Sequence, residues 1–310
     1  MATVAILLSD KRSGSTMLQD ELRRHPDIQR VDYSPHTYFE THHWLKAAVL
    51  LRRPDALYGD GRTYEGYGGR RNARAYMVDL LTRNVPEFTA PDDDEALVFE
   101  GWEALCGRYA RPVFFEKSPQ VLAHWAALDL LLEWRERTAH SVKLIGLVRN
   151  PLAVQHSAEA LFQSDPEVRQ LSWLRTQRNL LAVREMTLET DFRLFRYEDV
   201  VAEPQETLAQ ICAFIGVEPH PAVGEGVHGR SREKWAASDG FTLQLDRSVA
   251  RIARSLGYSG EELANANRAT AGAAARRSAP RRWRRAMTRL RDRLLRPVAM
   301  RLRRGLPAAR

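Results

Sequence analysis

Three short apolar runs and a fourth, more mixed run have the pattern of buried β-strands; they occupy residues 4–8, 112–116, 142–148 and 192–197. A nearly continuous apolar run is typical of a strand that is covered on both faces, whereas a strand with one wet face alternates. A segment with helical spacing follows each run, as in residues 121–134 and 207–215. This alternation predicts an α/β fold with a parallel central sheet and helices on both faces.

Polar and charged residues gather where the predicted strands end. The first strand runs into Ser-Asp-Lys-Arg-Ser-Gly-Ser-Thr at 9–16, the second into Lys117 and the third into Arg149. In open parallel sheets, ligands bind at the carboxyl ends of the strands. The candidate site is therefore expected at this edge of the sheet.

The pattern predicts one large domain, residues 1–258, followed by two short segments. Within it, residues 30–110 form an insertion of helices plus a loop rich in glycine and aromatic residues. We interpret this insertion as a lid that covers the binding site of a second, acceptor substrate. The alternative is a loop without a function. Residues 259–280, rich in Ala, Asn, Gly and Ser, are a predicted linker, and residues 281–310 form a basic tail.

The net charge of +8 comes from the end of the chain. Residues 276–310 contain 14 arginines and one acidic residue, whereas residues 1–275 contain 33 Lys and Arg against 38 Asp and Glu. The body is thus mildly acidic, which argues against nucleic acid as a partner of the globular part.

Two further features concern the compartment. No apolar run approaches the ~20 residues that span a bilayer, and the short first run is not typical of a signal peptide. Cys106 and Cys212 lack the spacing of metal ligands and predict buried thiols in a reducing environment. These observations predict a cytoplasmic protein.

The turn after the first strand has the composition of an anion site. Gly14 permits a tight turn in which successive backbone N–H groups converge, and the next helix adds its positive end. Ser13, Ser15 and Thr16 offer hydroxyl groups, and Arg12 offers a guanidinium. Gly14 is followed by serine, so the Gly-Lys pair of nucleoside-triphosphate P-loops is missing.

The end of the third strand supplies a second set of anion-binding groups. Asn150 is a favourable N-cap and Pro151 suits the first helical position, so a helix is expected to begin here. Ser157 lies seven residues after Asn150, close to two helical turns, and returns to the same face. Arg149 and Ser157 could then bind one phosphate group between them.

Together these motifs resemble the two nucleotide-binding motifs of sulfotransferases that use 3′-phosphoadenosine 5′-phosphosulfate (PAPS). Glu-Lys-Ser-Pro-Gln at 116–120 resembles the Lys-Ser-Pro segment of the bacterial and carbohydrate branches of that family. Later segments are similar to its remaining motifs, in the same order: 196–200, 204, 214–216, 228–235 and 256–258. The resemblance covers about residues 4–258 and implies the P-loop-like sulfotransferase fold.

The resemblance implies PAPS as the co-substrate and assigns roles to single residues. Residues 12–16 would hold the 5′-phosphosulfate, while Arg149 and Ser157 would bind the 3′-phosphate. Tyr197 would lie near the adenine. Candidates to close over the 3′-phosphate are Arg230 and Lys234.

The implied reaction is an in-line transfer of the sulfuryl group to a hydroxyl of a carbohydrate, lipid or other small acceptor. Arg12 and Lys117 would stabilise the charge on the departing phosphate oxygen. No cluster of metal ligands stands out in the sequence, so no metal is expected.

The reaction also needs a general base to take the proton of the acceptor hydroxyl. The resemblance does not assign this role to one residue, because Ser34 stands where related bacterial enzymes carry a glutamate. His36 and Glu40 are the best substitutes. Asp32 and His124 are further candidates.

The basic tail has one apolar stripe at positions 283, 287, 290, 294, 298 and 302, with arginines elsewhere and Pro297 as a break. We interpret it as an amphipathic helix on an anionic membrane surface, which would place the protein on the inner face of the membrane. A disordered extension or a helix docked on a protein partner is the alternative. For the whole chain, a P-loop-like kinase and a non-catalytic membrane or nucleic-acid adaptor remain as alternative functions.

Overall fold

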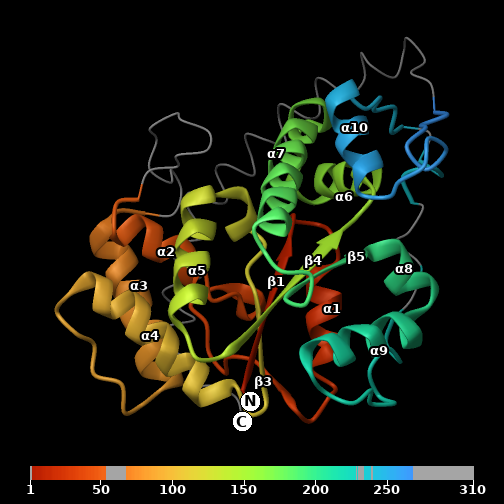
Figure 1. The fold of residues 1–310 in the computed structure, drawn as a ribbon. Coiled ribbons are helices and arrows are strands. Elements are labelled where there is room, and N and C mark those ends of the chain that lie inside the picture. The colour runs from red at the N-terminus through yellow and green to blue at the C-terminus, as the bar shows by residue number, and fades with distance from the viewer. Residues whose placement is uncertain (1, 54–67, 228, 230–233, 239, 268–310) are drawn as a thin grey trace.

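The chain folds around one sheet of five strands, and every hydrogen-bonded pair of strands is parallel (Figure 1). The strand order is β2-β3-β1-β4-β5. The strands are β1 (Thr3–Ser9), β2 (Ile28–Gln29), β3 (Val113–Lys117), β4 (Ser141–Val148) and β5 (Phe192–Arg196). This computed structural model describes residues 2–53, 68–227, 229, 234–238 and 240–267.

The four predicted strands correspond to β1, β3, β4 and β5, and the predicted α/β class is confirmed. Strand β2 was not expected, because two residues leave no periodic pattern. The described helices are α1 (Ser15–Leu22), α2 (His43–Leu50), α3 (Arg70–Asn84), α4 (Asp94–Tyr109), α5 (Trp125–Arg137), α6 (Pro151–Phe162), α7 (Pro166–Glu185), α8 (Tyr197–Ala202), α9 (Pro204–Ile215) and α10 (Arg247–Ser255), with 3-10 turns η1 (Thr37–Phe39) and η2 (Val121–Ala123). The helix expected over 121–134 is thus divided, because His124 adopts an extended backbone between η2 and α5.

The side chains of β1 alternate between two hydrophobic cores, one on each face of the sheet. Val4, Ile6 and Leu8 pack in the core that also receives α2 to α5, α7 and α10. Ala5 and Leu7 pack in the core formed with α1, α8 and α9. Since all five of these residues are at most 2% exposed, β1 is covered on both faces, as its continuous apolar sequence indicates.

The insertion at 30–110 contributes helices α2, α3 and α4 to the first of these cores. Most of its glycine- and aromatic-rich loop, residues 54–67, lies outside the described residues, so the predicted lid stays a prediction.

The segment after α10 packs on the domain as far as it is described. Asn265 donates hydrogen bonds to the carbonyl groups of Phe241 and Leu243 at 3.1 and 3.0 Å, and Leu263 is buried. The first nine residues of the predicted linker, 259–267, are therefore attached to the body. The remainder of the linker and the basic tail, 268–310, lie outside the described residues. None of the helices in the described ranges is both long and apolar enough to cross a membrane.

Candidate active site

A buried carboxylate, that of Asp10, stabilises the turn between β1 and α1. Asp10 accepts the N–H of Lys11 at 2.8 Å and both terminal nitrogens of Arg169, on α7, at 3.3 and 3.4 Å. Arg12 and Gly14 both have left-handed backbones, with φ of 75° and 93°. The chain thereby reverses within a few residues and α1 begins at Ser15.

Glycine is required at position 14 for a second reason. A β-carbon there would lie 2.3 Å from the Tyr197 ring. Tyr197, from the start of α8, therefore packs directly against the turn, and its ring also carries the Arg149 guanidinium 4.3 Å from its centroid.

The junction of β4 and α6 has the local structure that its sequence predicts. Asn150 caps the helix by accepting the N–H of Leu152 at 2.9 Å, and Pro151 occupies the first turn. Arg149 is 6% exposed and donates to the carbonyl of Arg12 at 3.0 Å. Burial lowers the pKa of Arg149, but an arginine remains charged at physiological pH.

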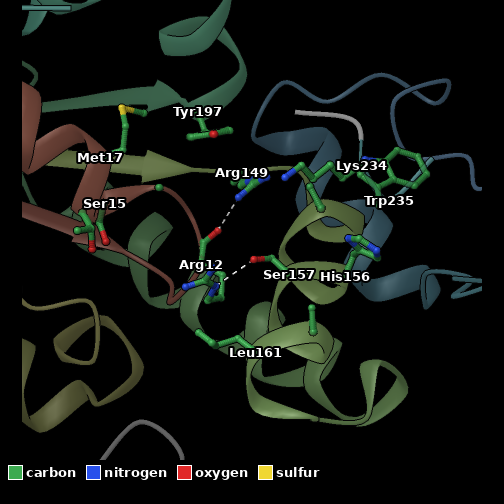
Figure 2. Close-up of a pocket in the computed structure, with 14 residues that line it drawn as sticks. Arg12, Ser15, Met17, Arg149, His156, Ser157, Leu161, Tyr197, Lys234 and Trp235 are labelled. Carbon is green, nitrogen blue, oxygen red and sulfur yellow. Dashed lines mark hydrogen bonds between the residues drawn. The ribbon is translucent and has the colours of Figure 1, made fainter. Parts of the chain in front are cut away.

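These two motifs share one cavity of about 520 Å³ (Figure 2). The side chain of Arg12 reaches across it, and its Nε donates to the Ser157 hydroxyl at 3.0 Å. The residues that line this first cavity include Arg12, Gly14, Ser15, Thr16, Arg149, His156, Ser157, Tyr197 and Lys234. No described residue of the lining is acidic, so the cavity suits an anion.

Two of the residues that were predicted to bind PAPS are not in the described lining of this cavity. Ser13 is completely buried, and its N–H donates to the Asp10 carbonyl, so it shapes the turn instead of facing the cavity. Arg230 lies outside the described residues.

Lys117, at the end of β3, is a charged side chain with no exposed surface. Its Nζ donates to Glu40 Oε1 at 2.9 Å and to Thr16 Oγ1 at 3.3 Å. Because Thr16 also lines the first cavity, Lys117 lies immediately behind the cavity wall, between the anion site and Glu40.

Glu40 joins a group of four polar side chains. Its Oε2 lies 3.2 Å from His36 Nδ1 and 3.1 Å from His42 Nε2, while Lys117 binds the other oxygen. Burial by itself raises the pKa of Glu40, but the hydrogen bond from His42 and the charge of Lys117 outweigh it and lower the pKa to about 2. Glu40 is thus ionised at neutral pH.

The same two histidines and Glu40 could also ligate a metal ion, since their donor atoms lie within 4.8 Å of one another. Lys117 already supplies a counter-charge for this carboxylate. The expectation of a metal-free site therefore stays a prediction.

The segment that carries Glu40 and His42 is fixed by residues next to Lys117. Glu116, which is buried, accepts the hydroxyl groups of Thr41 at 2.7 Å and Ser118 at 2.5 Å. Ser118 also accepts the N–H of His42 at 3.1 Å. Ser34 donates to the Glu40 carbonyl, so it closes this loop and supplies no acid–base group.

His42 was not a candidate in the sequence, and only its contact with Glu40 draws attention to it. Neither of the two further base candidates belongs to this group of four side chains. Asp32 accepts the Tyr109 hydroxyl at 3.1 Å within the helical insertion. His124 lines the second cavity described below; burial and then the nearby Arg175 and Lys11 lower its pKa to about 4.

A second cavity, of about 310 Å³, borders the same turn at Asp10 and Lys11. It is lined by Lys11 next to Arg12, and by Pro119 and Gln120 two and three residues after Lys117. Phe162 lies in its wall and Leu161 lies in the wall of the first cavity, so both cavities border the C-terminal end of α6.

Comparisons with known proteins agree with this architecture. The sequence model of the sulfotransferase family matches residues 6–221. The fold is similar to the sulfotransferase domain of the olefin synthase of Synechococcus PCC 7002, with a TM-score of 0.56 and 21% identity over 83% of this chain and 95% of that one. It is also similar to the sulfotransferase domain from the curacin biosynthetic pathway, with a TM-score of 0.52 and 22% identity over 84% and 99% of the two chains. No curated protein sequence gives a significant match.

Proposed function

Because this chain belongs to the sulfotransferase family, we propose that it transfers the sulfuryl group of PAPS to a hydroxyl group of a carbohydrate, lipid or other small acceptor. One observation carries this proposal: the Arg149–Ser157 pair and, far from it in sequence, the turn with Arg12 and residues 14–16 line a single cavity in which no described residue is acidic. The contact between Arg12 and Ser157 brings the two motifs within the reach of one nucleotide.

In this proposal the donor lies along the first cavity. The 5′-phosphosulfate meets the turn and the N-terminus of α1, where backbone N–H groups and the hydroxyls of Ser15 and Thr16 are available. The 3′-phosphate lies between Arg149, Ser157 and Lys234. Tyr197 faces the adenosine, and Arg230 remains a candidate to close over the 3′-phosphate.

The transfer breaks the bond from sulfur to the bridging oxygen and forms a bond from sulfur to the acceptor oxygen. Negative charge grows on the departing phosphate oxygen, so fixed cations beside it stabilise the transition state more than the ground state. Lys117 lies behind Thr16 and Arg12 lies in the turn, hence both can act on this oxygen. No step of this scheme needs a metal.

We assign the role of general base, which takes the proton of the acceptor hydroxyl, to the pair of His36 and Glu40. Glu40 alone is a weak base, because its pKa is about 2. His36 is the more exposed member, with 28% of its side chain accessible against 7% for Glu40. His36 would accept the proton, and Glu40 would orient it and stabilise the imidazolium, as in other carboxylate–histidine pairs.

The second cavity is the proposed entrance for the acceptor. It borders the turn at Asp10 and Lys11, and it borders the loop after Lys117 at Pro119 and Gln120. An acceptor hydroxyl placed there could approach sulfur from the side opposite the nucleotide, which an in-line transfer requires.

Calorimetry with 3′-phosphoadenosine 5′-phosphate (PAP) tests the proposal. The wild-type chain should bind PAP, and Arg149→Ala should weaken binding about 10- to 100-fold, the value of hydrogen bonds to a charged group. Arg178→Ala, an exposed arginine of α7, is the matched control and should bind like wild type.

The same titrations separate the alternatives. Equal binding of ATP with Mg²⁺ would favour a kinase, and binding of neither nucleotide would favour a non-catalytic adaptor. A mass gain of one sulfuryl group on an acceptor, only in the presence of PAPS, would complete the assignment.

A further inference from the structure

His156 is a titratable side chain in the first cavity to which neither the motifs nor the proposed reaction gives a role. It precedes Ser157 on α6 and lies on the side of the helix toward Lys234 and Trp235 (Figure 2). Its ring meets the Phe241 ring edge to face, with 5.1 Å between centroids. Within the described residues, no hydrogen bond holds its ring nitrogens.

Among the described residues, the charged groups that face His156 are cationic. Arg149 acts on it from the junction of β4 and α6, and Lys234 from the segment 234–238 that packs over α6. Arg12 lies further along the same lining, which contains no described acidic residue. Burial lowers the pKa of His156, and the charges of Arg149 and Lys234 lower it further. Both effects favour the neutral form of this imidazole.

A bound phosphate reverses this balance. A group carrying close to two negative charges between Arg149, Ser157 and Lys234 cancels the positive field at the neighbouring imidazole. It also favours the charged form of His156, since an opposite charge nearby raises the pKa of a histidine.

We propose that His156 takes up a proton from solvent when the 3′-phosphate of the donor binds, and so becomes an additional cation of the 3′-phosphate site. This inference rests on the proposed use of PAPS. The proton moves to a ring nitrogen of His156, and no covalent bond of the nucleotide changes. By linkage, a nucleotide whose binding requires a proton binds more tightly as the pH falls.

The test is calorimetric titration of the full chain with PAP between pH 6 and 8, in buffers of different ionisation enthalpy. PAP itself has phosphate groups that titrate near pH 6, so the comparison is between wild type and His156→Gln, in which that contribution is common. Wild type should take up more protons per PAP than His156→Gln. As the pH rises, the affinity of wild type for PAP should fall more steeply than that of the variant, by as much as about tenfold per pH unit.

Two controls place the effect. His140→Gln changes a histidine that is in the lining of neither cavity and whose Nε2 lies 3.3 Å from Glu103, so it should leave proton uptake at the wild-type value. Adenosine 5′-monophosphate lacks the 3′-phosphate, so with it wild type and His156→Gln should take up the same number of protons.

The proposal is overturned if PAP binds to wild type and His156→Gln with the same proton uptake, or if adenosine 5′-monophosphate produces the same difference as PAP. Absence of PAP binding to wild type would instead remove the proposed function itself. Should the variant not fold, the imidazole C–H resonances of wild type give the answer, because one of the nine histidines should shift from neutral to charged on adding PAP near pH 7.

Discussion

Lys117 has no exposed surface, and its Nζ is paired with the Glu40 carboxylate and the Thr16 hydroxyl. An isolated buried ammonium would lose its proton, whereas a close carboxylate and a hydroxyl acceptor compensate the lost water. Its sequence position after a buried strand indicated a site residue. Its partners, Glu40 and Thr16, lie 77 and 101 residues away and could be found only in the folded chain.

We expect Lys117→Met to lower kcat about 10²- to 10³-fold, since it removes a cation from the departing oxygen. The KM for PAPS should change much less, because the bridging oxygen of bound PAPS carries less charge than the departing oxygen of the transition state. The matched control is Lys143→Met, which changes a strand lysine whose partner is Asp191. Unchanged kcat in Lys117→Met would contradict the assigned role.

Glu40 yields a prediction about acid stability. Its pKa falls from 4.5 to about 2 on folding, so its ionised form stabilises the folded state. This contribution, on the order of 3 kcal/mol, is complete above about pH 4.5 and is lost as the pH falls toward 2. Glu40→Gln should therefore unfold at lower denaturant concentration than wild type at pH 7, and the gap should narrow by about half or more at pH 3.

The same variant tests the proposed base. Glu40→Gln and His36→Gln should each lower kcat by about 10²-fold or more while both still bind PAP. A His36→Gln variant with full activity would show that Glu40 acts without it.

At the scale of elements, the site is built from loops that leave one edge of the sheet. Strand order puts β1 between β3 and β4, so the ends of these three strands lie side by side. The turn after β1 therefore contacts Lys117 on one side and Arg149 on the other. Helix α7 adds a clamp, because Arg169 binds both the Asp10 carboxylate and the Lys11 carbonyl.

Gly14→Ala should disturb this edge. The variant would place a β-carbon 2.3 Å from the Tyr197 ring and impose a left-handed backbone on alanine. We expect a loss of more than ~1 kcal/mol in the free energy of unfolding, together with weaker PAP binding because Arg149 packs on Tyr197. Gly107→Ala, in α4 with open space around its β-carbon, should be neutral or stabilising. Equal melting temperatures for the two variants would contradict this account.

At the scale of the whole molecule, charge is divided between a mildly acidic body and a strongly basic end. Residues 276–310 carry 14 arginines and lie outside the described residues, so a partner for them can be proposed only from the sequence pattern. Each arginine near an anionic lipid surface contributes ~1 kcal/mol to binding. We propose this membrane role for the tail, with a docked helix or a disordered extension as the alternatives.

Removal of residues 276–310 should abolish sedimentation with phosphatidylserine vesicles and leave PAP binding intact. The intact chain should bind these vesicles less as salt increases, and should not bind neutral phosphatidylcholine vesicles. Equal vesicle binding by the intact and truncated chains would rule out the membrane role.

The sequence alone determined the class of fold, because continuous apolar strands and alternating helices are local patterns that each segment carries by itself. It also determined the start of α6, since Asn150 and Pro151 act within one helical turn. Only the tertiary structure decided four other features: the short strand β2, the burial of Ser13, the Glu40–His42 contact and the position of His156. Each of these depends on which distant segments the sheet order brings together, and a hydrogen bond or an electric field between such segments leaves no periodic trace in the chain.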